Sequence, residues 1–266
     1  MPNTTWSTSD LTGITLSGSN LTATVNNNAS GGIRSASLQA SGKQYWEYTA
    51  TSFTGANSGV GVANSSALLS VMPTSPTNAC LAYQPSGAIW LNNANTGSSI
   101  GAISSGSVVG VALDMTGRLI WFRIAPSGNW NGSGTANPAT GTGGISVSSI
   151  FGAQSAYAAF GSSTATGNGN AATANFGDAA FTGAVPSGFA AGFSVVPTTA
   201  NVTQALAEHW LTTNPDAQIT QVVAEHWASV TSGNLQAVVT QVMLEHWASV
   251  AVVVPAAGGP MVTMIH

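Results

Sequence analysis

Residues 108–122 read VVGVALDMTGRLIWF, and this stretch decides the fold. Two runs rich in β-branched and aromatic side chains, Val108–Asp114 and Leu119–Ile124, flank the polar sequence Asp-Met-Thr-Gly. This composition favours strands, and a short polar break between two such runs predicts a β-hairpin. We expect Gly117 to take a positive φ in the hairpin loop.

The same pattern continues on both sides of the hairpin, from residue 1 to about residue 192. Short strand-like runs alternate with turns rich in Gly, Ser, Asn and Pro, and no window sustains a capped helical period. Many short strands with Gly-rich turns predict an all-β sandwich or barrel. Besides the two strands of the hairpin, the clearest expected strands are 21–25, 44–52, 59–64, 88–91 and 172–176.

The chain is unusually poor in charge. Only 5% of its residues are charged, with four basic and eight acidic side chains, whereas soluble domains carry about 25%. Ser, Thr, Asn and Gly must therefore keep the surface hydrated. A neutral polar surface suits particles, adhesins and fibres, where packed charged copies would repel one another. Four Lys/Arg cannot neutralise a run of phosphates, so we expect no nucleic-acid partner and no docking on anionic membranes.

The cysteine content and the sequences of the two termini bear on disulfide bonding, secretion and membrane insertion. Cys80 is the only cysteine, which excludes an intrachain disulfide and predicts a small buried hydrophobe. The first ten residues lack the basic and apolar regions of a secretory signal. Residues 248–265 are uncharged, but Pro and Gly interrupt them, so we expect a buried strand with a tail and no membrane insertion.

Several segments, taken in order, resemble a SPRY domain, the two-sheet concanavalin-like β-sandwich. The resemblance covers roughly residues 10–192 and implies an antiparallel two-sheet fold. The first segment, SGKQYWEY, is similar to the GK-x-YWEV strand of the family. The matching segments are 41–48 (SGKQYWEY), 59–63 (GVGVA), 110–114 (GVALD), 119–124 (LIWFRI), 175–177 (NFG) and 185–189 (VPSGF).

The long loop 128–144 (GNWNGSGTANPATGTGG) and the low charge depart from animal SPRY modules. In both respects the chain looks like the SPRY-like domains of tailed-bacteriophage structural proteins. The resemblance implies a binding module that recognises partners through its loops and has no catalytic residues. The ligand differs between members of the family, so the resemblance does not supply one.

After Pro197 the composition changes and one motif recurs three times. The Glu-His-Trp of successive copies is separated by 17 and then 20 residues, which indicates one structural unit used three times. We therefore predict two domains, a SPRY-like sandwich over 1–192 and a repeat segment for docking or oligomerisation over 193–266. The copies are 202–210 (VTQALAEHW), 219–227 (ITQVVAEHW) and 239–247 (VTQVMLEHW).

Two secondary structures fit the repeats. As a helix, the second copy places apolar residues every third or fourth position from Ile219 to Val230, on one face. As strands, the Thr, Val and Ile content favours three antiparallel strands of about nine to eleven residues. The motif also resembles VTQ-type strand repeats of tailed-phage proteins, which favours strands. The helical alternative stays open.

The repeated histidines raise the possibility of a metal site. Adjacent Glu and His point to opposite faces of a strand, so only stacked histidines could converge on one ion, for example in a trimer. The simpler interpretation is that each copy reuses its packing residues, with tryptophan as core or interface anchor. We expect no metal and no cofactor. The weak metal candidates are His209, His226 and His246, and the expected anchors are Trp210, Trp227 and Trp247.

Catalytic signals are scarce in the first 192 residues. They contain no histidine, which excludes a Ser-His-Asp triad of their own. Glu47 is their only glutamate and falls on the strand face opposite Trp46 and Tyr48. A glycosidase pair would have to combine it with Asp10, Asp114 or Asp178, and Asp114 more readily caps the hairpin. We expect no enzymatic activity.

Aromatic residues in loops are the better candidates for binding. Trp130 and Asn131 lie in the long loop, and Tyr83 and Trp90 lie near the Pro-rich segment 73–86. Such rings can stack on sugars or partner surfaces. The alternative is that each ring tethers its loop to the sandwich.

These features together predict a non-catalytic virion structural protein of a tailed phage, in the decoration, neck or fibre class. It would be made in the host cytoplasm and carried on the virion surface. Its expected partners are other virion proteins, further copies of itself, with a trimer as one arrangement, and host surface glycans. The alternative is a carbohydrate-binding adhesin, and a glycan-active enzyme has the least support.

Overall fold

The computed structural model describes residues 3–26, 30–54, 57–163 and 169–193 in full. Further along it describes the backbone of five short strands between residues 201 and 244. The chain divides into two compact units, Met1–Val196 and Pro197–His266, and each is described by itself. Within the described residues, no helix has the length and apolarity needed to cross a membrane.

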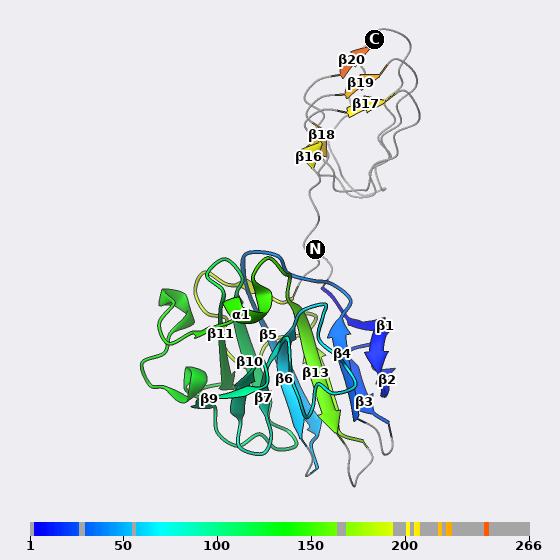
Figure 1. The fold of residues 1–266 in the computed structure, drawn as a ribbon. Helices are drawn as coiled ribbons and strands as arrows, with labels where there is room; N and C mark the ends of the chain where they lie inside the picture. Colours follow the sequence, from blue (N-terminus) through cyan, green and yellow to red (C-terminus); the bar gives the residue numbers. More distant parts are fainter. Residues whose placement is uncertain are drawn as a thin grey trace. The chain divides into compact units, whose positions relative to one another are not determined.

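The first unit is a sandwich of two antiparallel sheets (Figure 1). The seven-stranded sheet contains, in spatial order, β1 (Trp6–Thr12), β4 (Ser30–Ser35), β13 (Tyr157–Ser163), β6 (Ser58–Ala63), β7 (Ala79–Tyr83), β8 (Ala88–Leu91) and β9 (Ala94–Ser99). The eight-stranded sheet contains β12 (Ile145–Ser146), β11 (Leu119–Ile124), β10 (Val108–Asp114), β5 (Lys43–Ser52), β14 (Ala171–Asn175), β3 (Thr22–Val25) and β2 (Ile14–Ser17), with β15 (Ala190–Ala191) parallel to β5.

The predicted all-β, two-sheet architecture is confirmed. Each of the seven expected strands is present, and no expected boundary differs from the observed one by more than one residue. The described helical segments are single turns: η1 (Trp130–Gly132), η2 (Pro138–Thr140) and α1 (Ser148–Phe151).

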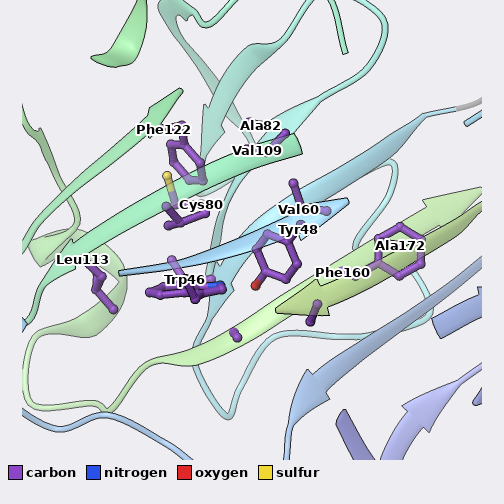
Figure 2. Packing of buried hydrophobic residues seen from close by; sticks show 14 of the residues in the cluster. Trp46, Tyr48, Val60, Cys80, Ala82, Val109, Leu113, Phe122, Phe160 and Ala172 are labelled. Atoms are coloured by element: carbon purple, nitrogen blue, oxygen red, sulfur yellow. The ribbon is translucent and has the colours of Figure 1, made fainter. Parts of the chain in front are cut away.

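The core lies between the two sheets and is rich in aromatic rings. Trp46 and Tyr48 of β5 are fully buried there and appear with Val60 and Phe160 in Figure 2. Burying a large apolar side chain stabilises a fold by about 1.5–3 kcal/mol. The Tyr48 hydroxyl also donates a hydrogen bond to the Gly61 carbonyl of the opposite sheet at 2.8 Å. The two sheets are therefore joined by a polar contact as well as by packing.

Cys80 lies in the same core, as predicted. Its burial raises the pKa of the thiol well above the ordinary value, because the thiolate would be desolvated there. The thiol is therefore a poor nucleophile in the folded chain.

The hairpin from which the fold was predicted is present, with one correction. Asp114 pairs with Leu119, and the Asp114 carboxylate accepts hydrogen bonds from the backbone N–H groups of Thr116 and Gly117 at 2.9 and 2.7 Å. The predicted positive φ at Gly117 is wrong, because Arg118 takes it, at 54°. Gly117 serves another purpose. A Cβ there would lie 2.9 Å from the Asp114 carboxylate, so the cap leaves no room for one.

The described part of the second unit comprises five very short strands, all paired in parallel. The strand interpretation of the repeats is confirmed at β16 (Asn201–Val202), β17 (Ala205–Ala207), β18 (Gln218–Ile219), β19 (Val222–Ala224) and β20 (Val242–Leu244). The prediction of long antiparallel strands is wrong, because β16 pairs with β18, and β17, β19 and β20 pair in order, all in parallel.

The register of these strands explains the repeat. Ala205 pairs with Val222, and Val222 pairs with Val242, which are equivalent positions in the three copies. Parallel pairing brings equivalent positions of the three copies side by side, as expected of one structural unit used three times. The expected anchors Trp210, Trp227 and Trp247, the histidines His209, His226 and His246, and segment 248–265 lie outside the described residues.

Candidate functional site

The outer face of the eight-stranded sheet carries the best candidate for a binding surface. Along β5, β10 and β11 every second side chain points away from the core. On this side the buried residues Tyr45, Ala112, Trp121 and Phe189 form a separate apolar cluster. Loops 125–144 and 176–189 contribute further residues to it, so we call this region the covered face.

Glu47 fastens one of these loops to the sheet. Its side chain is 2% exposed and accepts three hydrogen bonds, from the Tyr45 hydroxyl at 2.6 Å and from the backbone N–H groups of Thr182 and Gly183 at 2.8 and 2.7 Å. A buried carboxylate is tolerated only when such donors surround it. The predicted orientation of Glu47, opposite Trp46, is confirmed.

The environment of the Tyr45 hydroxyl, which donates to Glu47, keeps it in the protonated form. Desolvation by burial, and then the hydrogen bond to Glu47, raise the pKa of Tyr45 well above its ordinary value. The hydroxyl therefore stays protonated across the physiological range and keeps its bond to the carboxylate. This arrangement favours a structural pairing over proton transfer.

Arg123 of β11 is the most distinctive cation of the covered face. Its guanidinium carbon lies 4.4 Å from the ring centroid of Trp130, and its Nη2 donates to the Ala184 carbonyl at 2.7 Å. Ion pairs among the described residues are Arg34–Asp10 and Lys43–Asp114, so Arg123 forms none. The Nε of this guanidinium is buried and has no hydrogen-bond partner among the described residues. A stacked, half-buried guanidinium without a carboxylate partner can still take part in ligand recognition.

Loop 128–144 places Trp130 on this face and turns Asn131 inward. Trp130 packs edge-on against Tyr45, with centroids 6.2 Å apart. Asn131 is buried at φ 49°, where its Oδ1 accepts from the Phe122 N–H at 2.9 Å and its Nδ2 donates to the Gly143 carbonyl at 2.9 Å. The side chain of Asn131 therefore fastens the loop to β11, and the half-buried Trp130 remains next to Arg123.

The other two candidate aromatics lie on the opposite sheet. Tyr83 and Trp90 pack in a cluster on the outer side of the seven-stranded sheet. Tyr83 is 7% exposed, and its hydroxyl donates to the Met72 carbonyl at 2.6 Å. The structure thus brings Trp130 and Asn131 together but separates them from Tyr83 and Trp90. Arg123 was missed, although its two-residue spacing from Trp121 on one strand is the signal that places both on one face.

All four acidic side chains of the first unit are engaged. Besides Glu47, Asp10 holds Arg34 through two bonds of 2.6 and 2.9 Å, and Asp114 pairs with Lys43 at 3.3 Å. Asp178 accepts a bond from the Asn3 side chain at 3.2 Å. The described part of the chain contains no cluster of three or more His, Cys, Asp or Glu side chains able to hold a metal ion.

Comparisons with known proteins identify the fold. No family model and no curated protein sequence matches the chain. Among solved structures, the SPRY domain of human HERC1 is similar, with 14% identity, a TM-score of 0.50, and coverage of 64% of this chain and 96% of that domain. The PSpry domain of TRIM65 matches with 15% identity, a TM-score of 0.46, and coverage of 65% and 92%. The first unit therefore has a SPRY-like β-sandwich fold.

We predict that Asn131→Ala releases loop 128–144 from the sheet. The substitution removes the side-chain partners of Phe122 and Gly143 and leaves an alanine at positive φ, which should cost about 2–4 kcal/mol of unfolding free energy. Urea denaturation and limited proteolysis of the loop measure the effect. Asn129→Ala is the matched control, because Asn129 is exposed in the same loop. Equal stability of both variants would contradict the anchoring role of Asn131.

Proposed function

We propose that this chain is a non-catalytic binding and assembly protein. The observation that carries the proposal is that each of the four carboxylates of the first unit is held by hydrogen-bond donors of its own fold. The first 196 residues also contain no histidine. General acid–base chemistry needs a group free to take up and release a proton beside the substrate, and these carboxylates are used for structure.

We further propose that the protein is a virion structural component of a tailed phage, made in the host cytoplasm and displayed on the particle. Three features support this role: the 5% charge content, the long loop 128–144, and tandem repeats that stack in parallel. A nearly neutral surface lets many copies pack without mutual repulsion. Its partners are then other virion proteins, which the repeat unit docks on, and further copies of the chain.

A carbohydrate-binding adhesin is the second candidate, and it is compatible with the first. The stacked Arg123–Trp130 pair favours it, because a planar cation beside a half-buried indole suits a ring with hydroxyl or carboxylate substituents. A glycan-active enzyme has less support. Glu47, which such an enzyme would need, is 2% exposed and already has three donors.

The virion role predicts that the protein co-purifies with intact particles. Phage from an infected culture would be banded on a density gradient and analysed by mass spectrometry. Chymotrypsin is the appropriate protease, since four Lys/Arg in the whole chain leave trypsin few sites. Peptides of the chain should follow the particle band in proportion to the major capsid protein. Their confinement to the soluble fraction of the lysate would contradict the virion role.

The adhesin role predicts glycan binding that depends on Trp130. On a glycan array, Trp130→Ala should lower binding by about ten-fold or more, the effect expected from losing roughly 1.5 kcal/mol of stacking. Trp90→Ala is the matched control, because Trp90 is also half-buried but lies on the other sheet. No glycan binding by the unmodified chain would count against an adhesin, and an equal loss in both variants would count against Trp130 as the glycan contact.

A further inference from the structure

Arg123 contacts both of the loops that lie on the covered face. Its guanidinium carbon lies 4.4 Å from the ring centroid of Trp130, which belongs to loop 125–144. Its Nη2 donates a hydrogen bond of 2.7 Å to the carbonyl oxygen of Ala184, which belongs to loop 176–189. Strands β13 and β14 separate the two loops along the chain. One side chain of β11 therefore joins two segments that are distant in sequence.

We propose that Arg123 is a positioning residue that couples these two loops, so that they form one recognition surface and open together. The inference rests on the adhesin role proposed above, because it adds loop 176–189 to the surface around Trp130. Coupling between two positions acts in both directions. A ligand that binds the closed form of one loop therefore tightens the other.

A shared aromatic contact supports the coupling. Tyr45 is fully buried, and one ring of each loop packs edge-on against it. The ring centroid of Trp130 lies 6.2 Å from that of Tyr45, and the ring centroid of Phe181 lies 5.2 Å from it. Ala136 and Val185, again one from each loop, pack against the same apolar cluster. A displacement of either loop therefore changes contacts that the other loop uses.

Gly183 lets its loop approach the guanidinium closely. A Cβ at this position would lie 2.6 Å from Nη2 of Arg123 and 2.8 Å from the hydroxyl oxygen of Tyr45. It would also lie 3.2 Å from Oε1 of Glu47. Gly183 does not have a positive φ, so an added methyl group acts through these contacts and not through backbone strain. The guanidinium is the end of a flexible side chain, so we expect the methyl group to displace it from its stacked position on Trp130.

Each loop has a backbone N–H group that reports whether the loop is docked on the sheet. In loop 125–144, the side chain of Asn131 accepts a hydrogen bond of 2.9 Å from the N–H of Phe122. For the other loop, the N–H groups of Thr182 and Gly183 donate to the carboxylate on β5 at 2.8 and 2.7 Å. Hydrogen–deuterium exchange at these amides measures how often each loop opens.

Gly183→Ala in the full chain tests the coupling. The added methyl group should accelerate exchange at Phe122 by about five-fold or more, a coupling of the usual size. Gly134→Ala is the matched control, because it adds the same methyl group within loop 125–144, where no atom beyond the chain neighbours lies within 4 Å of the new Cβ. This control should leave exchange at Phe122 unchanged.

Trp130→Ala tests the coupling in the opposite direction, and exchange at Thr182 and Gly183 should then accelerate. The amide of Phe160, in the other sheet, should not change in any variant, because its exchange follows opening of the core. Unchanged exchange at Phe122 in the glycine variant, unchanged exchange at Thr182 in the tryptophan variant, or equal acceleration at Phe160 would overturn the proposal.

Arg123→Lys tests whether the guanidinium carries the coupling. Lysine keeps the charge, but its ammonium group lacks the planar shape that stacks on Trp130 while donating to Ala184. In the Arg123→Lys background, Gly183→Ala should cause no further acceleration of exchange at Phe122. Persistence of the full effect in this background would show that another contact couples the loops, and would overturn the assignment to Arg123.

The coupling and the adhesin role fail separately, because exchange is measured without a ligand. Coupled loops in a chain that binds no glycan on the array keep the assignment of Arg123 and remove the adhesin role. Glycan binding that depends on Trp130, in a chain whose loops exchange independently, keeps the adhesin role and removes the coupling.

Discussion

The buried carboxylate of Glu47 is the constraint on which the covered face depends. Strand β5 is buried on both sides, with Trp46 and Tyr48 toward the core and Tyr45 and Glu47 toward the loops. An ionised carboxylate that is 2% exposed costs several kcal/mol unless donors replace its water. The Thr182 and Gly183 N–H groups supply them, so loop 176–189 must close over the sheet. The closed loop also supplies the Ala184 carbonyl, which accepts a hydrogen bond from Arg123, and Arg123 stacks on Trp130.

The sequence predicts the regular parts of the fold well because their signals are local. The hairpin of β10 and β11 follows from two apolar runs and a polar break, and its strand boundaries match. Strand β9 reads ANTGSS, whose composition gives no strand signal, and only pairing with β8 makes it one. The positive φ at Arg118 also depends on a contact and not on composition, because the hydrogen bonds that the Asp114 carboxylate accepts fix the conformation of the loop. Parallel pairing of the repeats depends on contacts 17 and 20 residues apart, which composition does not encode.

In the candidate site, too, the sequence predicts the residues placed by strand alternation and not those placed by contacts between distant segments. Alternation along a strand places Glu47 opposite Trp46, and it would equally have placed Arg123 beside Trp121. No local pattern tells whether an asparagine in a Gly-rich loop faces solvent, and Asn131 turns inward because β11 offers it an N–H. For the same reason the sequence does not separate Trp130 from Tyr83, which the sandwich places on different sheets. Composition, by contrast, needs no fold to be interpreted: the low charge of the chain and the lack of histidine in its first 196 residues are read directly from the sequence.

Hydrogen–deuterium exchange at Thr182 and Gly183 tests the central claim most directly. If the Glu47 carboxylate locks the loop, both amide protons should exchange far more slowly than those of an open loop. Glu47→Gln keeps the size of the side chain but removes its charge and one acceptor oxygen, so exchange at both positions should accelerate. Exchange of both amides at the rate of an unstructured peptide in the unmodified protein would contradict the account.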